Sequence, residues 1–264
     1  MTPMTPLRER VAYGSIGWVT WPLADVARKV AAMGIRGIEG LGLTELMPED
    51  QNLGAVLKSL NVKFAGSYFG ASLVQKDRRA TEIGNFTATV RKVSEWGGSV
   101  IALGGGRDYP EASTTEREVH WQNLIEGVHE FARIAQAHQV QIGFHPHDHT
   151  RVYRLDEIRR FLKDTAKAPS PAGLTFDTAH IGAAGMDILD AWEEFAPRVV
   201  HVHVKDLTKI GDFCELGAGQ LPLQQFVRML REKAYPGWLT IELDATPDPE
   251  ASALKSWNQL KLWI

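Results

Sequence analysis

Short apolar segments alternate with longer amphipathic segments along the whole chain, and this alternation limits the choice of fold more than any other feature. The short segments predict strands at Val11–Trp18, Gly37–Leu41, Val62–Tyr68, Val100–Gly104, Val140–His147, Gly173–Asp177, Val199–Lys205 and Trp238–Leu243. The longer segments have helical periodicity and predict helices at Leu23–Met33, Leu53–Leu60, Thr81–Trp96, Thr115–His138, Leu155–Lys163, Leu221–Lys233 and Pro249–Trp263, with a short helix within Met186–Phe195. Strands that alternate with helices run parallel and are joined by crossover connections.

Eight strands of this kind favour a closed barrel over an open sheet covered by helices on both faces. A (β/α)₈ barrel takes about 250 residues, and this chain has 264. No linker rich in Pro, Gly or Ser and no block of like charges divides the sequence. We therefore expect a single α/β domain, a TIM barrel, over residues 1–264.

Composition and charge exclude several classes of function. The formal net charge of −3 argues against a protein that binds nucleic acid. No run of about 18 or more apolar residues is present, so no membrane span is expected. The single cysteine rules out an internal disulfide, and the start of the chain, Met1–Arg10, lacks the apolar core of a secretory signal. We expect a cytoplasmic protein, and a homo-oligomer is compatible with the sequence.

Side chains that can bind a metal ion gather at the ends of four predicted strands in the second half of the chain. Since side chains alternate across a strand, His201, His203 and Lys205 share one face of the seventh strand and three valines share the other. The fifth, sixth and eighth strands separate polar from apolar faces in the same way. Buried polar groups are costly unless they are paired or coordinated, so the pattern predicts a shared site on the barrel axis. The residues are His145 and His147 in GFHPHDH, Asp177 in TFDTAH, His203 in VVHVHVKD and Glu242 in LTIELD.

The residue types in this set predict one divalent metal ion as cofactor. Two imidazoles with two carboxylates suit Mn²⁺, Zn²⁺, Fe²⁺ or Co²⁺ and are poor ligands for Ca²⁺. The absence of cysteine ligands argues against a structural zinc site. A lone inward histidine is more often a hydrogen-bonded core residue, and Asp177 alone would be explained as a cap of the following turn. The joint pattern at four strand ends favours the metal, with Mn²⁺ first and Co²⁺, Zn²⁺, Fe²⁺ or Mg²⁺ as alternatives.

These residues lie in motifs that resemble the xylose-isomerase-like barrel superfamily, which contains sugar isomerases, epimerases, inosose dehydratases and apurinic endonucleases. The resemblance covers nearly the whole chain. Its most specific motifs are FDTAH at 176–180, HVHVKD at 201–206, LGAGQLPL at 216–223 and GWLTIE at 237–242. The histidine-rich FHPHDHT at 144–150, and the segments 21–42 and 65–73, resemble inosose dehydratases in particular.

The resemblance implies a metal site formed by His145, Asp177, His203 and Glu242. Family members usually carry a glutamate where this chain has His145, so His147 is the alternative fourth ligand. Apurinic endonucleases need further histidines at the third and fourth strand ends, where this chain reads GSYFG and ALGGGR. Their trinuclear site cannot be assembled, which argues against a role in DNA repair.

Three further residues match family positions that face the substrate. His180 matches a position used for substrate or a second metal, Lys205 matches a pocket lysine, and Glu39 matches an acidic residue at the end of the second strand. Each has a structural alternative: a bond from His180 to a loop carbonyl, a pairing of Lys205 with Asp206 or Asp177, and a pairing of Glu39 with an arginine. The aromatic residues near strand ends can stack on a sugar ring, although packing is their commoner role; they are Trp18, Trp21, Tyr68 and Phe69.

The implied chemistry begins with a keto-sugar or keto-cyclitol held on the metal by its carbonyl and an adjacent hydroxyl. His147 or Glu242 would remove the α-proton to give an enediolate. A dehydratase also needs an acid, for which His180 or Lys205 is a candidate because imidazole titrates near neutrality and a buried amine can have a lowered pKa.

The histidine-rich fifth strand favours an inosose-dehydratase-like lyase. The alternatives are a sugar isomerase or 3-keto-sugar epimerase, or an enzyme that removes the sugar from oxidised glycosides. A non-catalytic sugar-binding barrel is the alternative from another class.

Overall fold

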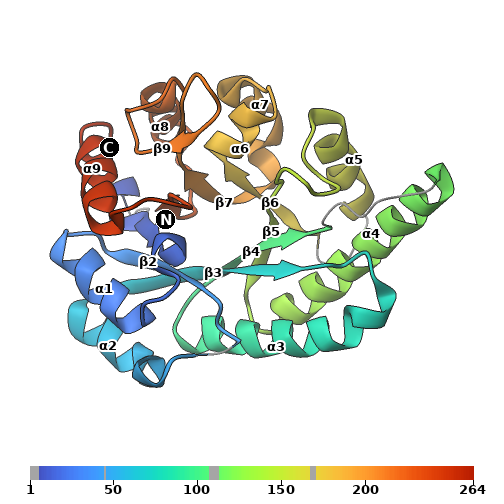
Figure 1. Cartoon of the computed structure of the whole chain (residues 1–264), viewed down its shortest axis with the longest axis horizontal. Coiled ribbons are helices and arrows are strands. Elements are labelled where there is room, and N and C mark those ends of the chain that lie inside the picture. The colour runs from blue at the N-terminus through green and yellow to red at the C-terminus, as the bar shows by residue number, and fades with distance from the viewer. Residues whose placement is uncertain (1–5, 45, 107–112, 167–170) are drawn as a thin grey trace.

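Eight parallel strands close into a barrel in the computed structural model, which describes residues 6–44, 46–106, 113–166 and 171–264 (Figure 1). Around the barrel the strands follow the order β1-β2-β3-β4-β5-β6-β7-β10, and β10 pairs with β1 to close it. The TIM barrel expected from the sequence is confirmed. The strands are β1 (Val11–Gly14), β2 (Gly37–Leu41), β3 (Lys63–Ala71), β4 (Val100–Gly105), β5 (Gln141–Phe144), β6 (Gly173–Asp177), β7 (Val199–Val204) and β10 (Leu239–Ile241).

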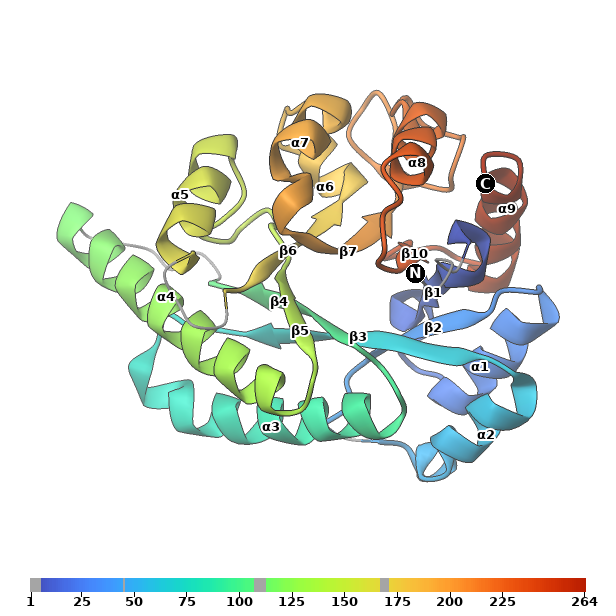
Figure 2. The same cartoon turned by 180° about the vertical axis from the view of Figure 1, so that it is seen from behind.

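Helices form a ring around the strands, as Figures 1 and 2 show from opposite sides. Helix α8 illustrates why: its buried residues Leu223, Phe226, Val227 and Leu230 recur at helical spacing and form one apolar stripe. None of the helices in the described ranges is long and apolar enough to cross a membrane. The helices are α1 (Leu23–Ala32), α2 (Leu53–Leu60), α3 (Arg79–Glu95), α4 (Thr114–Ala137), α5 (Leu155–Thr165), α6 (Thr178–Ala183), α7 (Ile188–Phe195), α8 (Leu223–Glu232) and α9 (Pro249–Lys261), with 3₁₀ turns η1 (Leu7–Arg10), η2 (Ser15–Trp18), η3 (Pro48–Asp50), η4 (Lys76–Arg78) and η5 (Ala196–Arg198).

The barrel interior is polar along part of its axis. Glu39 of β2 hydrogen-bonds to His201 and His203 of β7. Strands β1 and β10 separate β2 from β7 in the ring, so these contacts cross the interior. Val202 and Val204 point the opposite way and are fully buried against the outer layer. The alternation of polar and apolar residues in β7 therefore separates the site from the core between strands and helices.

Four of the predicted strands extend too far at their carboxyl ends, and the seventh strand does so by the single residue Lys205. The predicted strand Val11–Trp18 stops at Gly14 and continues as the 3₁₀ turn η2. Strand β5 stops at Phe144 and β10 at Ile241, so His145 and Glu242 each follow the last residue of a strand. The backbone N–H groups of these two residues still donate to Leu103 and Val204 of neighbouring strands. This last hydrogen bond keeps their side chains in line with the strand while the chain leaves the sheet.

Two elements near the end of β7 were not predicted from the sequence: the short helix α6 and the antiparallel hairpin of β8 (Asp206–Leu207) and β9 (Phe213–Cys214). The buried Asp206 carboxylate organises the hairpin and its continuation, because it accepts hydrogen bonds from the backbone N–H groups of Leu207, Gly217, Gly219 and Leu221. A Cβ atom at Gly219 would lie 2.2 Å from Asp206 Oδ1, so only glycine fits there.

Candidate metal centre

Four side chains from separate strands converge at the carboxyl end of the barrel. One ligand atom from each of His145, Asp177, His203 and Glu242 lies within 4.8 Å of the others. His203 Nδ1 lies 2.8 Å from Glu242 Oε2, and His145 Nε2 lies 3.5 Å from Asp177 Oδ2. All four side chains are buried. The structure thus brings together the four residues for which the sequence predicts metal binding, and it places His145, not His147, in the group.

The arrangement of these atoms fits a bound cation. Asp177 Oδ2, His203 Nδ1 and Glu242 Oε2 are buried and lack a well-directed hydrogen bond. His203 Nδ1 and Glu242 Oε2 are 2.8 Å apart, and Lys205 Nζ lies 3.4 Å from both carboxylates, so these atoms form ion pairs without a well-directed hydrogen bond. A buried polar atom without a good hydrogen bond costs about 1–3 kcal/mol, so a cation bound among the three would stabilise this arrangement. The other oxygen of Asp177, Oδ1, accepts from the N–H groups of Ala179 and His180 at the start of α6. That cap fixes the carboxylate with Oδ2 turned toward the cluster.

Glu39 fixes the orientation of His203 from the side away from the cluster. Its Oε1 lies 3.0 Å from His203 Nε2, and its Oε2 lies 2.7 Å from His201 Nε2. Glu39 is buried, 3% exposed, and its partners are these two imidazoles. The alternative expectation, a pairing of Glu39 with an arginine, is wrong. Because Nε2 of His203 is engaged by Glu39, Nδ1 is the ring nitrogen that faces Asp177 and Glu242.

Burial and charge set the protonation of the cluster. Burial alone would raise the pKa of Glu242, but the positive charges of His203 and Lys205 outweigh it and lower this pKa to about 2. Burial opposes protonation of His203, yet the carboxylates of Glu242 and Glu39 raise its pKa well above the usual value. Burial lowers the pKa of His145. An ionised Glu242 and a neutral His145 are the forms that bind a cation.

Lys205 lies in the cluster as a protonated amine. Its Nζ is 2.8 Å and 2.9 Å from the carboxylate oxygens of Asp244 and 3.4 Å from Asp177 and Glu242. Burial lowers the pKa of Lys205, but these carboxylates outweigh it and raise the pKa above its usual value. The expectation of a lowered pKa is wrong for this lysine, because burial comes with three negative charges. Of its two suggested partners, Asp177 is close, whereas Asp206 serves the hairpin.

His147 and His180 form a second pair of imidazoles beside the cluster. Their ring centroids are 4.0 Å apart, and His147 Nδ1 lies 2.5 Å from Asp148 Oδ1. The His147 side chain is half-exposed, whereas His180 is buried. Burial lowers the pKa of His180 to about 2. The expectation that His180 titrates near neutrality is therefore wrong, because its buried imidazole is neutral.

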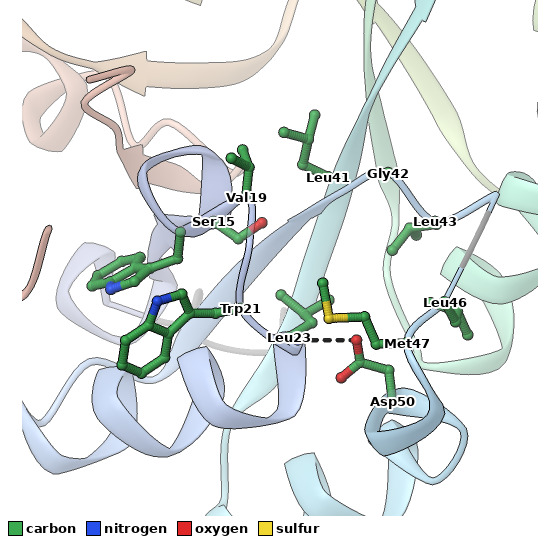
Figure 3. A pocket seen from close by; sticks show the side chains of 11 residues that line it. Ser15, Val19, Trp21, Leu23, Leu41, Gly42, Leu43, Leu46, Met47 and Asp50 are labelled. Atoms are coloured by element: carbon green, nitrogen blue, oxygen red, sulfur yellow. Dashed lines mark hydrogen bonds between the residues drawn. The ribbon is translucent and has the colours of Figure 1, made fainter. Parts of the chain in front are cut away.

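The aromatic residues expected near the substrate lie in different surroundings. The half-buried Tyr68 ring is edge-on to His145, with centroids 6.1 Å apart. Trp18 packs edge-on against Tyr13 at 5.2 Å and is buried, whereas Trp21 is 45% exposed. Both tryptophans line a pocket between the segments that follow β1 and β2 (Figure 3).

Three residues in contact with the cluster were not assigned from the sequence. His201 bonds Glu39, Asp244 pairs with Lys205, and the Phe213 ring lies 4.8 Å from both the His180 ring and Lys205 Nζ. The alternation of side chains along a strand could have identified the first two, because His201 shares a strand face with His203, and Asp244 lies two residues after Glu242. Phe213 had no such signal, since its position depends on the hairpin.

A closed parallel barrel with a buried cluster of imidazole and carboxylate groups at the carboxyl ends of its strands is the class of fold and site that this chain presents. The chain belongs to the xylose isomerase-like TIM barrel family, whose model matches residues 27–262. The inosose dehydratase of Clostridium beijerinckii is 26% identical, and the match covers 96% of this chain and 97% of that protein.

Solved structures share the fold over almost the whole chain. The 3-keto-D-glucoside 4-epimerase from E. coli has a TM-score of 0.79 and 14% identity, and the match covers 96% of this chain and 99% of that one. An IolI protein with a bound zinc atom has a TM-score of 0.77 and 15% identity, with 97% and 99% covered.

Proposed function

We propose that this protein is a divalent-metal-dependent enzyme that removes the proton α to the carbonyl of a keto-sugar or keto-cyclitol and then expels the β-hydroxyl, as an inosose-dehydratase-like lyase. The observation that carries the proposal is the convergence of Asp177 Oδ2, His203 Nδ1 and Glu242 Oε2, all buried and without a well-directed hydrogen bond. The similarity to proteins named inosose dehydratase, which extends over nearly the full length of both chains, supports the choice of substrate class.

His145, Asp177, His203 and Glu242 would hold one divalent ion, with Mn²⁺ first and Co²⁺, Zn²⁺, Fe²⁺ or Mg²⁺ as alternatives. When bound there, the ion would supply Lewis acidity for the removal of a proton α to a carbonyl. Glu39 acts through His203, because its hydrogen bond to Nε2 leaves Nδ1 free for the ion.

His147 is the proposed base. Its half-exposed ring reaches the mouth of the barrel, and Asp148 beside Nδ1 orients it so that Nε2 is left for a substrate proton. Glu242 is the alternative base, although its Oε2 faces the cluster. The neutral His180 and the protonated Lys205 would bind substrate oxygens, with Lys205 donating to the departing hydroxyl. Tyr68 and Trp18 are proposed to border the substrate.

Epimerisation or isomerisation is the second candidate, and the fold match to a 3-keto-D-glucoside epimerase favours it. It shares the removal of the α-proton with the lyase reaction, but the proton then returns to the other face or to the neighbouring carbon, and the β-hydroxyl is kept. Removal of the sugar from an oxidised glycoside shares the same first step, and a sugar-binding barrel without catalysis lacks it.

The shared first step gives the test. The Mn²⁺-loaded protein is incubated with an inosose and with 3-keto-glucose in D₂O, and exchange of the α-proton is followed by NMR. We expect metal-dependent exchange that falls at least about 100-fold in Asp177→Asn. Asp187→Asn is the matched control, because Asp187 also caps a helix, α7, through its side chain. Exchange that persists in EDTA, or no exchange with either compound, would refute the proposal.

A further inference from the structure

A pocket of about 240 Å³ lies at the same end of the barrel as the metal cluster, between the segments that follow β1 and β2 (Figure 3). None of the residues placed in the proposed reaction except Trp18 lines it. Its walls are mainly apolar and include Val19, Trp21, Leu41, Leu43, Leu46 and Met47.

Residues at the ends of β1 and β2 connect the pocket to the metal cluster. Ser15 lines the pocket directly after Gly14, and a Cβ atom at Gly14 would lie 3.4 Å from Glu242 Cγ. On β2, Leu41 follows Glu39 by two residues, so both side chains lie on the same strand face, with Leu41 nearer the mouth. A molecule held at the cluster thus has this pocket as its neighbour on the β1–β2 side.

The chemistry of the walls selects an apolar ligand. Asp50 is the one charged residue in the described lining, and its carboxylate accepts the N–H groups of Leu23 at 3.0 Å and Ala24 at 2.7 Å. These bonds hold the segment after β2 against the start of α1 and occupy both oxygens of the carboxylate. Val19 and Trp21 are 61% and 45% exposed, so apolar surface faces water at the rim.

The pocket is large enough for one part of a ligand but too small for a whole one. Pockets that enclose a whole small molecule measure roughly 300–1,000 Å³, which is more than the volume found here. We propose that this pocket is a subsite for an apolar, ring-sized substituent, an aromatic aglycone, on a sugar whose oxidised ring lies at the metal cluster. The proposal rests on the proposed function, since it assigns the substrate of that same site.

The test compares the dissociation constants of phenyl and methyl β-D-glucoside for the Mn²⁺-loaded protein by calorimetry. Neither compound has a carbonyl group, so α-proton removal cannot consume them. We expect the phenyl glucoside to bind at least about tenfold more tightly. Met47→Gln keeps the length of the side chain and makes it polar, and Leu41→Asn does the same at the strand end; both residues are half-buried. Both variants should bring the ratio close to one.

Met229→Gln on α8 is the matched control, because Met229 is also half-buried but lies outside the pocket lining, and it should leave the ratio unchanged. Equal affinities in the wild type, a ratio that survives both variants, or no binding of the phenyl glucoside at its solubility limit would overturn the subsite. So would a change in oligomeric state in Met47→Gln without a change in the ratio, since a second copy would then be the occupant. If the phenyl glucoside binds more tightly than the methyl glucoside but no keto-sugar exchanges its α-proton in D₂O, the proposed function is refuted and the apolar subsite stands.

Discussion

His203 has carboxylates beside both ring nitrogens, and this makes it the residue on which the cluster depends most. Glu39 holds Nε2 from within the barrel, while Nδ1 faces Asp177 and Glu242. A ligating histidine whose second nitrogen is bonded to a carboxylate keeps one ring orientation and one tautomer. Glu39 is therefore a positioning residue in our account, and its contribution can be measured as metal affinity.

Glu39→Gln should weaken Mn²⁺ binding about 10- to 100-fold, because an amide holds His203 less firmly than a carboxylate does. Glu82→Gln is the control: Glu82 is also buried, and its carboxylate accepts the N–H groups of Ser72 and Leu73 away from the cluster. Calorimetric titration of metal-free protein gives both constants. Equal affinity in Glu39→Gln and wild type would exclude the positioning role.

Metal binding should release protons. In the metal-free protein the carboxylates of Glu242 and Glu39 raise the pKa of His203 well above its usual value, so the imidazole starts out protonated. Nδ1 must lose its proton to bind a metal, and affinity therefore rises with pH and falls as the solution becomes more acidic. Titrations in two buffers of different ionisation enthalpy measure the protons released, about one per ion. A dissociation constant that does not change with pH would contradict this assignment of His203.

At the scale of elements, the hairpin of β8 and β9 brings Phe213 against His180 and Lys205. The order of this hairpin comes from one carboxylate, Asp206, which accepts four backbone N–H groups. Hydrogen bonds to a charged group are worth about 1.5–3 kcal/mol each, so one side chain fixes a segment that has little apolar packing of its own.

Asp206→Ala should lower the free energy of unfolding by about 2 kcal/mol, because four backbone N–H groups, one buried and three partly buried, lose their acceptor. It should also raise KM more than it lowers kcat, since Phe213 loses its place beside His180 and Lys205. Asp212→Ala changes an exposed carboxylate of the same hairpin and should do neither. Urea unfolding and steady-state kinetics test both effects. An Asp206→Ala protein as stable as Asp212→Ala would show that the hairpin is ordered by other contacts.

The strands were predictable where alternation of polar and apolar residues continues to their ends. Gly37–Leu41 and Gly173–Asp177 were predicted with the observed bounds. Val11–Trp18 and Val140–His147 were predicted too long, because apolar residues continue into η2 and histidines continue beyond β5. The hairpin could not be predicted, since its order depends on long-range bonds to Asp206 and not on periodicity.

The four residues of the cluster were predictable from the sequence, but the choice between the two histidines after β5 and the protonation states were not. Parity placed His145, Asp177, His203 and Glu242 on faces that meet on the barrel axis. Parity could not choose between His145 and His147, which share a face; the end of β5 at Phe144 and the following turn separate them. The pKa values of His180 and Lys205 were also out of reach, because they depend on burial and on neighbours distant in sequence.

At the scale of the whole molecule, barrel closure brings the four proposed ligand residues together. His145 and Glu242 directly follow β5 and β10, Asp177 is the last residue of β6, and His203 lies in β7. These strands span about a hundred residues of sequence, and each strand end is fixed by its neighbours in the ring. The unfolded chain has no such site, so a bound ion stabilises the folded state by an amount set by its concentration relative to Kd.

The direct test is the stoichiometry and stabilisation produced by Mn²⁺ added to metal-free protein. We predict one ion per chain and, at a free concentration 100 times Kd, an increase of about 2.7 kcal/mol in the free energy of unfolding. Asp177→Asn should abolish both effects and Asp187→Asn should retain them. Unfolding curves that Mn²⁺ leaves unchanged, with no ion retained by the wild-type protein, would contradict the shared metal site.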